Sequence, residues 1–290
     1  MEKRKSFADY KLDGHNWITL ATGEYYPDFL NDACELYKPV LLIFGELLGA
    51  SESSVQLFLK ISEITDEWMR TQLARIFRRY VSPKLPVEML KKKRKAEEIC
   101  KQYGSGFRPI QEVRNAYVRR SIPDEALCAI LREYQDRGKE GYGLTERFFS
   151  LFRSQFSDLI IEGPERAGKD ILMGKVFKDY PKPKRPVDFI IREQNSDILA
   201  IGLARYDSDR GGSQEDDRTG GYQNCADEIL GYAQNHDLKT KVIFLNDGLG
   251  LLLGSMWDDY SNLEKISPDK ILVVTLRMVP ERLTIEWLRS

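Results

Sequence analysis

Histidine is scarce in this sequence, and its cysteines are scattered. Only two of the 290 residues are histidines, and the four cysteines, Cys34, Cys100, Cys128 and Cys225, form no C-x-x-C pair. A structural zinc site needs closely spaced cysteine and histidine ligands, so we expect none. Scattered thiols suit a reducing compartment, and we therefore expect a cytoplasmic protein.

Long apolar runs are missing as well. No stretch approaches the roughly 18 consecutive apolar residues that a membrane-spanning helix needs. Residues 1–15 carry charge but lack the apolar core of a signal peptide. We therefore expect neither a membrane anchor nor secretion.

The chain also lacks a dominant charge sign. Its 44 basic and 45 acidic side chains leave a net charge of −1, although charged residues make up 31% of the composition. Any binding to nucleic acid must therefore depend on local basic patches. One such run is residues 91–95, which forms either a solvated helix face or a contact for phosphates.

The pattern of apolar residues changes near residue 143. Residues 26–137 have helical spacing and little strand signal, and Pro39 is expected to divide the first long helix into two. Residues 137–143 are rich in glycine. Beyond them, strands alternate with helices, which favours an α/β (α+β) mixed sheet. We predict a helical domain at residues 1–143 and a mixed-sheet domain at residues 144–290.

One acidic residue stands out in the second domain. Residues 186–191 form a short apolar run that contains Asp188, and residues 193–197 have the composition of a turn. Residues 198–206 are aliphatic and predict a second strand, with a helix expected at residues 224–235. A carboxylate inside an apolar strand is costly to bury alone, so we expect a cation beside Asp188.

These residues resemble the core of the PD-(D/E)XK nucleases, and more narrowly the type II restriction endonucleases. The resemblance lies in Pro186-Val187-Asp188, in the acidic and Arg-Gly-Gly segment from Asp207 to Gly212, and in residues 244–252. It covers residues 144–290. It implies a restriction-endonuclease-like fold that hydrolyses double-stranded DNA with Mg²⁺, as a homodimer or with a paired subunit.

The resemblance also implies roles for individual residues. Asp188 would bind the metal, and Glu146 would be a further ligand. The family's Glu-x-Lys pair points to one face of the neighbouring strand, and here it falls most naturally on Gly202 and Ala204. Either a nearby residue substitutes for the missing acid, or Gly202 has replaced it and the protein is catalytically disabled. The nearest candidates are Arg205, Asp207 and Glu193.

Two polar segments are candidates for DNA contacts. Residues 208–222 form a polar arm whose Arg210, Gln214 and Arg218 suit guanine and adenine edges, although a surface loop is an equal interpretation. Residues 163–170 contain Arg166 and Lys169, which could face an anion.

The sequence leaves two other functions open. A DNA-binding protein that does not cleave would fit the missing Glu-x-Lys pair. Residues 163–170 match G-x-x-x-x-G-K and raise a P-loop NTPase as the other alternative, but Asp170 stands where a phosphate loop needs Ser or Thr.

Overall fold

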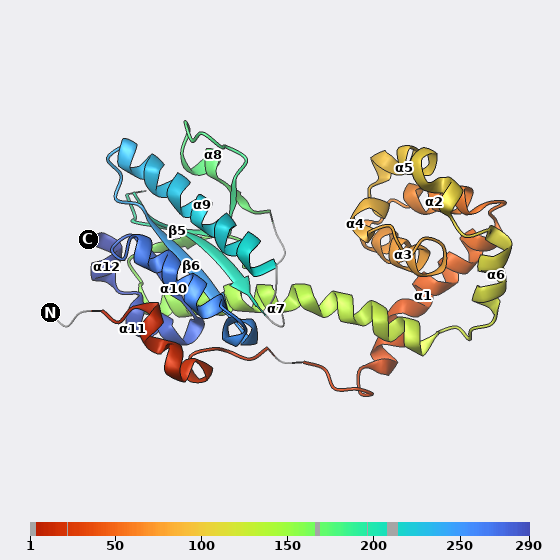
Figure 1. The fold of residues 1–290 in the computed structure, drawn as a ribbon, viewed down its shortest axis with the longest axis horizontal. Helices are drawn as coiled ribbons and strands as arrows, with labels where there is room; N and C mark the ends of the chain where they lie inside the picture. Colours follow the sequence, from red (N-terminus) through yellow and green to blue (C-terminus); the bar gives the residue numbers. More distant parts are fainter. Residues whose placement is uncertain (1–3, 22, 166–168, 196, 208–213) are drawn as a thin grey trace. The chain divides into compact units, whose positions relative to one another are not determined.

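The computed structural model describes residues 4–21, 23–165, 169–195, 197–207 and 214–290, with side chains for all of these except 134–142 and 214–219. The backbone is a mixed α/β structure (Figure 1). It separates into two compact units. One is Gly23–Asp136, and the other combines Met1–Thr22 with Arg137–Ser290.

The smaller unit contains helices and no strand among its described residues. Polar residues set the starts of two of them, because the side chains of Ser53 and Asp66 accept hydrogen bonds from the first-turn amides of Gln56 and Met69. The apolar faces of the helices enclose one core. The helices are α1 (Leu30–Gly49), α2 (Ser54–Glu63), α3 (Glu67–Tyr80), α4 (Val87–Leu90), α5 (Ala96–Tyr103), α6 (Ile110–Val118) and the first part of α7 (Glu125–Gln155), with short 3₁₀ turns η2 (Lys93–Lys95) and η3 (Gly104–Gly106).

Two expected helix breaks are wrong. Pro39 lies inside the continuous helix α1, where its ring is exposed and water can reach the carbonyl that loses a partner. The glycine-rich residues 137–143 lie inside α7. Each helical glycine costs about 1 kcal/mol relative to alanine, and α7 is held at both ends because Cys128 packs in one core and Phe148 in the other.

The larger unit is built on five strands in the order β1-β4-β5-β6-β7. β1, β4 and β5 are antiparallel neighbours, whereas β5, β6 and β7 run parallel. Parallel neighbours need a crossover, and α9 and α10 provide these. The strands are β1 (Ile160–Glu162), β4 (Phe189–Arg192), β5 (Ile198–Tyr206), β6 (Lys241–Asp247) and β7 (Ile271–Val274), and the helices of this unit include α9 (Gln214–Asn235) and α10 (Met256–Ile266).

Shorter elements complete this unit. A separate pair of strands lies beside the main sheet, and the chain after β7 ends in short helices. They are η1 (Phe7–Asn16), β2 (Ile171–Leu172), α8 (Met173–Val176), β3 (Pro186–Val187), η4 (Leu249–Leu252), η5 (Leu276–Met278), α11 (Val279–Arg282) and α12 (Ile285–Arg289).

The N-terminal segment belongs to this second unit, although we expected it in the helical domain. The ring of Phe7 stacks on Trp257 of α10 with 4.6 Å between centroids. The Trp257 indole N–H donates to the Phe7 carbonyl at 3.1 Å, and the Phe7 amide donates to the buried Glu264 at 2.9 Å. Contacts made by distant residues, rather than local pattern, determine where this segment lies.

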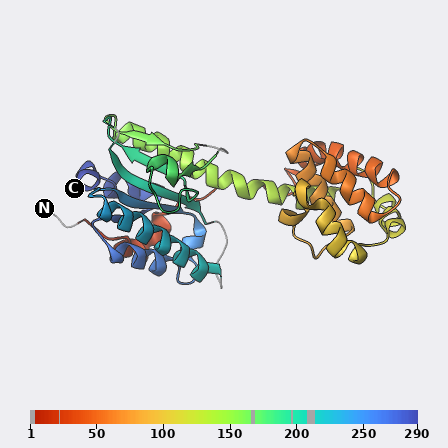
Figure 2. The same ribbon diagram turned by 90° about the horizontal axis from the view of Figure 1, so that it is seen from above.

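Helices cover both faces of the main sheet (Figure 2). On one face, the rings of Phe148 and Phe149 from α7 contact Phe189, with centroids 4.9 and 6.1 Å away. On the other face, Tyr222 of α9 packs on Phe244 of β6 at 5.1 Å. The strand expected at residues 198–206 is confirmed, while the one expected at 186–191 is interrupted at Asp188.

Gly202 lies on the α7 face of β5. It pairs with Phe189 in the β4–β5 register, and a Cβ added at position 202 would lie 1.9 Å from the Phe189 ring. Position 204 shares this face because side chains alternate along a strand. The expectation that Gly202 and Ala204 stand where the family's acid and lysine point toward Asp188 is therefore wrong, since the ring of Phe189 occupies that space.

We predict that Gly202→Ala lowers the free energy of unfolding by about 1–3 kcal/mol, because the added methyl group forces the Phe189 ring to move. Gly231→Ala is the matched control. A Cβ at Gly231 meets nothing within 4 Å, and the residue lies inside α9, so this change should stabilise by about 0.5–1 kcal/mol. Urea denaturation of both variants tests this, and equal stability of Gly202→Ala and wild type would contradict the packing.

Candidate functional site

Asp188 lies between β3 and β4, at the end of the sheet where β5 and β6 finish. Its Oδ2 atom accepts a hydrogen bond from the Ala204 amide at 2.8 Å, and its own amide donates to the Gly202 carbonyl at 3.0 Å. The carboxylate thus replaces a backbone acceptor at the point where the β4–β5 ladder stops. Ala204 contributes to the site through its backbone only.

Burial and the negative charge of a second acid both raise the pKa of the Asp188 carboxyl. Burial raises the pKa of the Asp188 carboxyl, the Ala204 amide lowers it, and the negative charge of Asp170 raises it again. Asp170 is exposed and immediately precedes β2. Two carboxylates that repel each other beside a partly desolvated position suit a divalent cation, which would relieve both effects.

A second polar cluster follows at the end of β5. Arg205 donates from Nε to Oδ1 of Asp207 at 2.6 Å, and the Tyr260 hydroxyl lies 3.4 Å from the other carboxylate oxygen. The side chain of Asp207 is 2% exposed, whereas that of Arg205 is 34% exposed. Asp207 is therefore held by its partners, while the guanidinium of Arg205 reaches solvent.

Tyr222 and Asn246 surround this ion pair on the α9 face. Burial raises the pKa of Tyr222 to about 12, while the nearby positive charge of Arg205 lowers it. Asn246 pairs with Arg205 in the β5–β6 register and is fully buried. Among the described residues, neither polar atom of its side chain has a hydrogen-bond partner. The cluster is thus polar inside an otherwise apolar layer.

The structure separates some of the residues that the sequence brought together. Glu193 lies at the hairpin end of β4, where Arg289 donates to it at 2.6 Å, so β4 stands between it and Asp188. It cannot supply the second carboxylate. Glu146 lies on α7, one turn before Phe149, and its role as a metal ligand stays a prediction.

Several predicted DNA-contacting residues lie wholly or partly outside the described part of the chain. Arg166 and Arg210 lie outside the described residues. Gln214 and Arg218 lie in α9, with side chains outside the described set, so the arm expected at residues 208–222 is helical from residue 214 on. Lys169 is described and exposed.

The surroundings of residues 163–170 differ from those of a phosphate loop. Strand β1 precedes Gly163, but the next element after Asp170 is strand β2 and not a helix. A Cβ on Gly163 would lie 2.3 Å from the Asp188 carbonyl oxygen. Close packing against Asp188 therefore accounts for this glycine, and the context of a P-loop NTPase is not found here.

Sequence reasoning did not select Asp170, Tyr222 or Tyr260 as site residues. Asp170 appeared only as a departure from a phosphate-loop pattern, and Tyr222 only as the last residue of a polar arm. The usable sequence signal for Asp170 was its position in a loop directly after Lys169. Nothing local marks the tyrosines, because tertiary packing brings them to Asp207.

Within the described ranges, no group of three or more His, Cys, Asp or Glu side chains could hold a metal ion. No helix in the described part of the chain combines the length and apolar character needed to cross a bilayer. Comparisons with protein-family models, curated proteins and solved structures found no match.

We predict that Asp188→Asn stabilises the metal-free protein at about pH 7. The raised pKa means that the folded state favours the protonated carboxyl, so stability falls as pH rises through the folded-state pKa. Asparagine removes this cost and can still accept the Ala204 hydrogen bond. A gain of about 1 kcal/mol would raise the melting temperature by roughly 2–4 °C, and the gain should vanish near pH 3.

Asp207→Asn is the control with the opposite sign, because it removes the charge that pairs with Arg205. It should cost about 1–3 kcal/mol at the same pH. Thermal melts in the presence of a chelator measure both variants. A lower melting temperature for Asp188→Asn at about pH 7 would show that its charge is compensated in the folded protein.

Proposed function

We propose that this protein is a Mg²⁺-dependent endonuclease that hydrolyses phosphodiester bonds in double-stranded DNA. The observation that carries the proposal is a pair of acids, Asp188 directly before β4 and Asp170 directly before β2. Asp188 is desolvated there and feels the negative charge of Asp170. Carboxylate oxygens are the ligands that Mg²⁺ prefers, and a bound divalent cation would remove this repulsion.

Asp188 and Asp170 would hold the metal. When bound, Mg²⁺ lowers the pKa of a coordinated water and neutralises charge on the scissile phosphate. Asp188 directly precedes β4, Arg205 lies on β5, and a hairpin joins these two strands, which is the order that the resemblance to PD-(D/E)XK nucleases implies.

Arg205 would take the place of the family's lysine. Its Nε atom is directed at Asp207, and its planar guanidinium suits phosphate oxygens through the terminal N–H groups. Asp207 then acts as a positioning residue that orients the guanidinium, because its own side chain is buried away from substrate. An arginine stays protonated, so it would stabilise phosphate charge rather than remove a proton from water.

A DNA duplex has two strands, and cleavage of both needs two sites. The proposal therefore includes a homodimer or a paired subunit. The restriction-endonuclease-like arrangement of the larger unit is part of the same proposal, with the helical unit contributing DNA contacts or dimer surface.

A DNA-binding protein without cleavage is the second candidate. It is favoured by the lack of a three-residue metal group among the described side chains, and by the glycine and alanine at positions 202 and 204. Gel shifts with and without Mg²⁺, run beside a plasmid-cleavage assay, separate the two. Binding without cleavage in either Mg²⁺ or Mn²⁺ would support the second candidate.

We predict that Asp188→Asn lowers the plasmid-cleavage rate at least about 100-fold and abolishes calorimetric Mn²⁺ binding, because it removes a metal ligand. Asp170→Asn should weaken both by a smaller factor, since it keeps Asp188. Asp179→Asn is the matched control, being an exposed aspartate on the same segment. Unchanged cleavage by Asp188→Asn would refute the assignment.

A further inference from the structure

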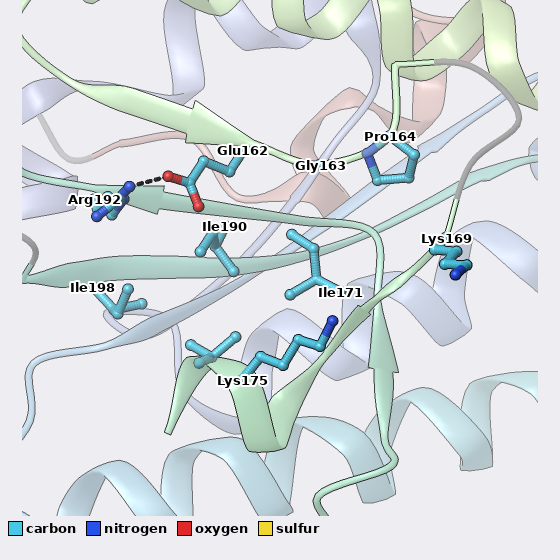
Figure 3. A pocket seen from close by; sticks show the side chains of 10 residues that line it. Glu162, Gly163, Pro164, Lys169, Ile171, Lys175, Ile190, Arg192 and Ile198 are labelled. Atoms are coloured by element: carbon cyan, nitrogen blue, oxygen red, sulfur yellow. Dashed lines mark hydrogen bonds and ion pairs between the residues drawn. The ribbon is translucent and has the colours of Figure 1, made fainter. Parts of the chain in front are cut away.

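A cavity of about 650 Å³ opens at the edge of the sheet, between β1 and β4 on one side and the segment that carries β2 and α8 on the other (Figure 3). It is lined by both apolar and charged side chains. The charged ones come from three separate segments, namely β1, β4 and residues 169–175. The charged residues are Glu162, Lys169, Lys175 and Arg192, and the apolar ones include Ile171 and Ile190.

The cavity has an excess of positive charge. Arg192 forms an ion pair with Glu162, drawn in Figure 3, so these two charges balance each other. Lys169 and Lys175 remain. Neither ammonium group has a hydrogen-bond or ion-pair partner in the described part of the chain. Two uncompensated cations at one concave surface attract an anion.

The floor between the charges is apolar. Ile171, Ile190 and Ile198 contribute to it, each from a different strand. Ligand pockets of about 300–1,000 Å³ combine such an apolar surface with a few charged groups that fix orientation. A ligand that fits must therefore carry a compact anion and a flat or apolar body.

We propose that this cavity binds a nucleoside phosphate, with the phosphate between Lys169 and Lys175 and the base or sugar against the isoleucines. Ile190 lies two residues beyond Asp188, which is about 7 Å along the chain. Lys169 directly precedes Asp170. The cavity thus adjoins the two acids, and the nucleotide next to a scissile phosphate would reach it.

A DNA strand and a free nucleotide are two sources of the same chemistry. The DNA form of the proposal rests on the proposed nuclease function, whereas the free-nucleotide form does not. An experiment with both ligands therefore separates the two sources.

The first arm is a calorimetric titration with deoxyadenosine 5′-monophosphate in the absence of metal. Lys175→Met should weaken binding about tenfold, because it removes a charge-assisted contact and keeps the length of the side chain. Lys178→Met is the matched control. It removes the same charge from an exposed position on the same segment that does not line the cavity. Inorganic phosphate should bind more weakly than the nucleotide, and equal affinity would refute the role of the apolar floor.

The second arm is duplex binding with Ca²⁺ in place of Mg²⁺, measured by gel shift on the same three proteins. A loss of DNA affinity for Lys175→Met that exceeds the loss for Lys178→Met identifies the strand as the source. If Lys175→Met loses affinity for the mononucleotide alone, a free nucleotide is the source of the phosphate. The proposal is overturned when Lys175→Met and Lys178→Met behave alike in both arms.

The two proposals fail in different ways. Asp188→Asn should leave mononucleotide binding within twofold of wild type while abolishing cleavage. A protein that binds the nucleotide through Lys175 but does not cleave DNA would support the cavity proposal and contradict the nuclease proposal. A protein that cleaves DNA while Lys175→Met changes the affinity for neither ligand would support the nuclease proposal and contradict the cavity proposal.

Discussion

The contact between the Phe189 ring and the backbone of Gly202 determines which residues can act together in the larger unit. The ring occupies the space that a side chain at position 202 would need, and it is held there by Phe148 and Phe149 of α7. This packing fixes the pairing of β4 with β5. A one-residue shift would exchange the faces of every side chain on β5. The α7 face is therefore closed beside Gly202, and the charged side chain of β5, Arg205, is directed to the α9 face.

The carboxylates near the end of β5 take part in two kinds of pair, a neutralised ion pair and a pair of acids that repel each other. Arg205 and Asp207 neutralise each other, and Tyr260 adds a contact to the buried carboxylate. Asp188 and Asp170 are both acidic, and Asp188 is partly removed from water. An ion pair such as Arg205 with Asp207 is typical of a group that stabilises a fold, whereas two acids such as Asp188 and Asp170 are typical of a site that binds a cation. This contrast is why Asp188, and not Asp207, is the centre of the proposed site.

Local pattern was sufficient for part of this protein. The aliphatic run at residues 198–206 predicted β5, and a lone acid in an apolar run drew attention to Asp188. Local pattern was insufficient where contacts with residues distant in the sequence determine the structure of a segment. The glycines of residues 137–143 lie in a helix because both ends of α7 are packed into cores, and Phe7 joins the larger unit through Trp257 and Glu264. The alternation of side chains along a strand predicted that positions 202 and 204 lie on one face of β5, but only the packing of Phe189 shows that this is the α7 face.

The N-terminal segment explains why the site opens to one side. The buried Asp247 at the end of β6 accepts hydrogen bonds from the amides of Thr19, Gly248 and Leu276, and the Tyr206 hydroxyl contacts both Thr19 and Ala21. Burial raises the pKa of the Asp247 carboxyl, and these three amides oppose that shift. The α7 face at the ends of β5 and β6 is thus closed by backbone from the start of the chain. Among the described residues, Asp188, Asp170 and Arg205 are ionisable groups that a substrate could approach next to the cavity lined by Lys169 and Lys175.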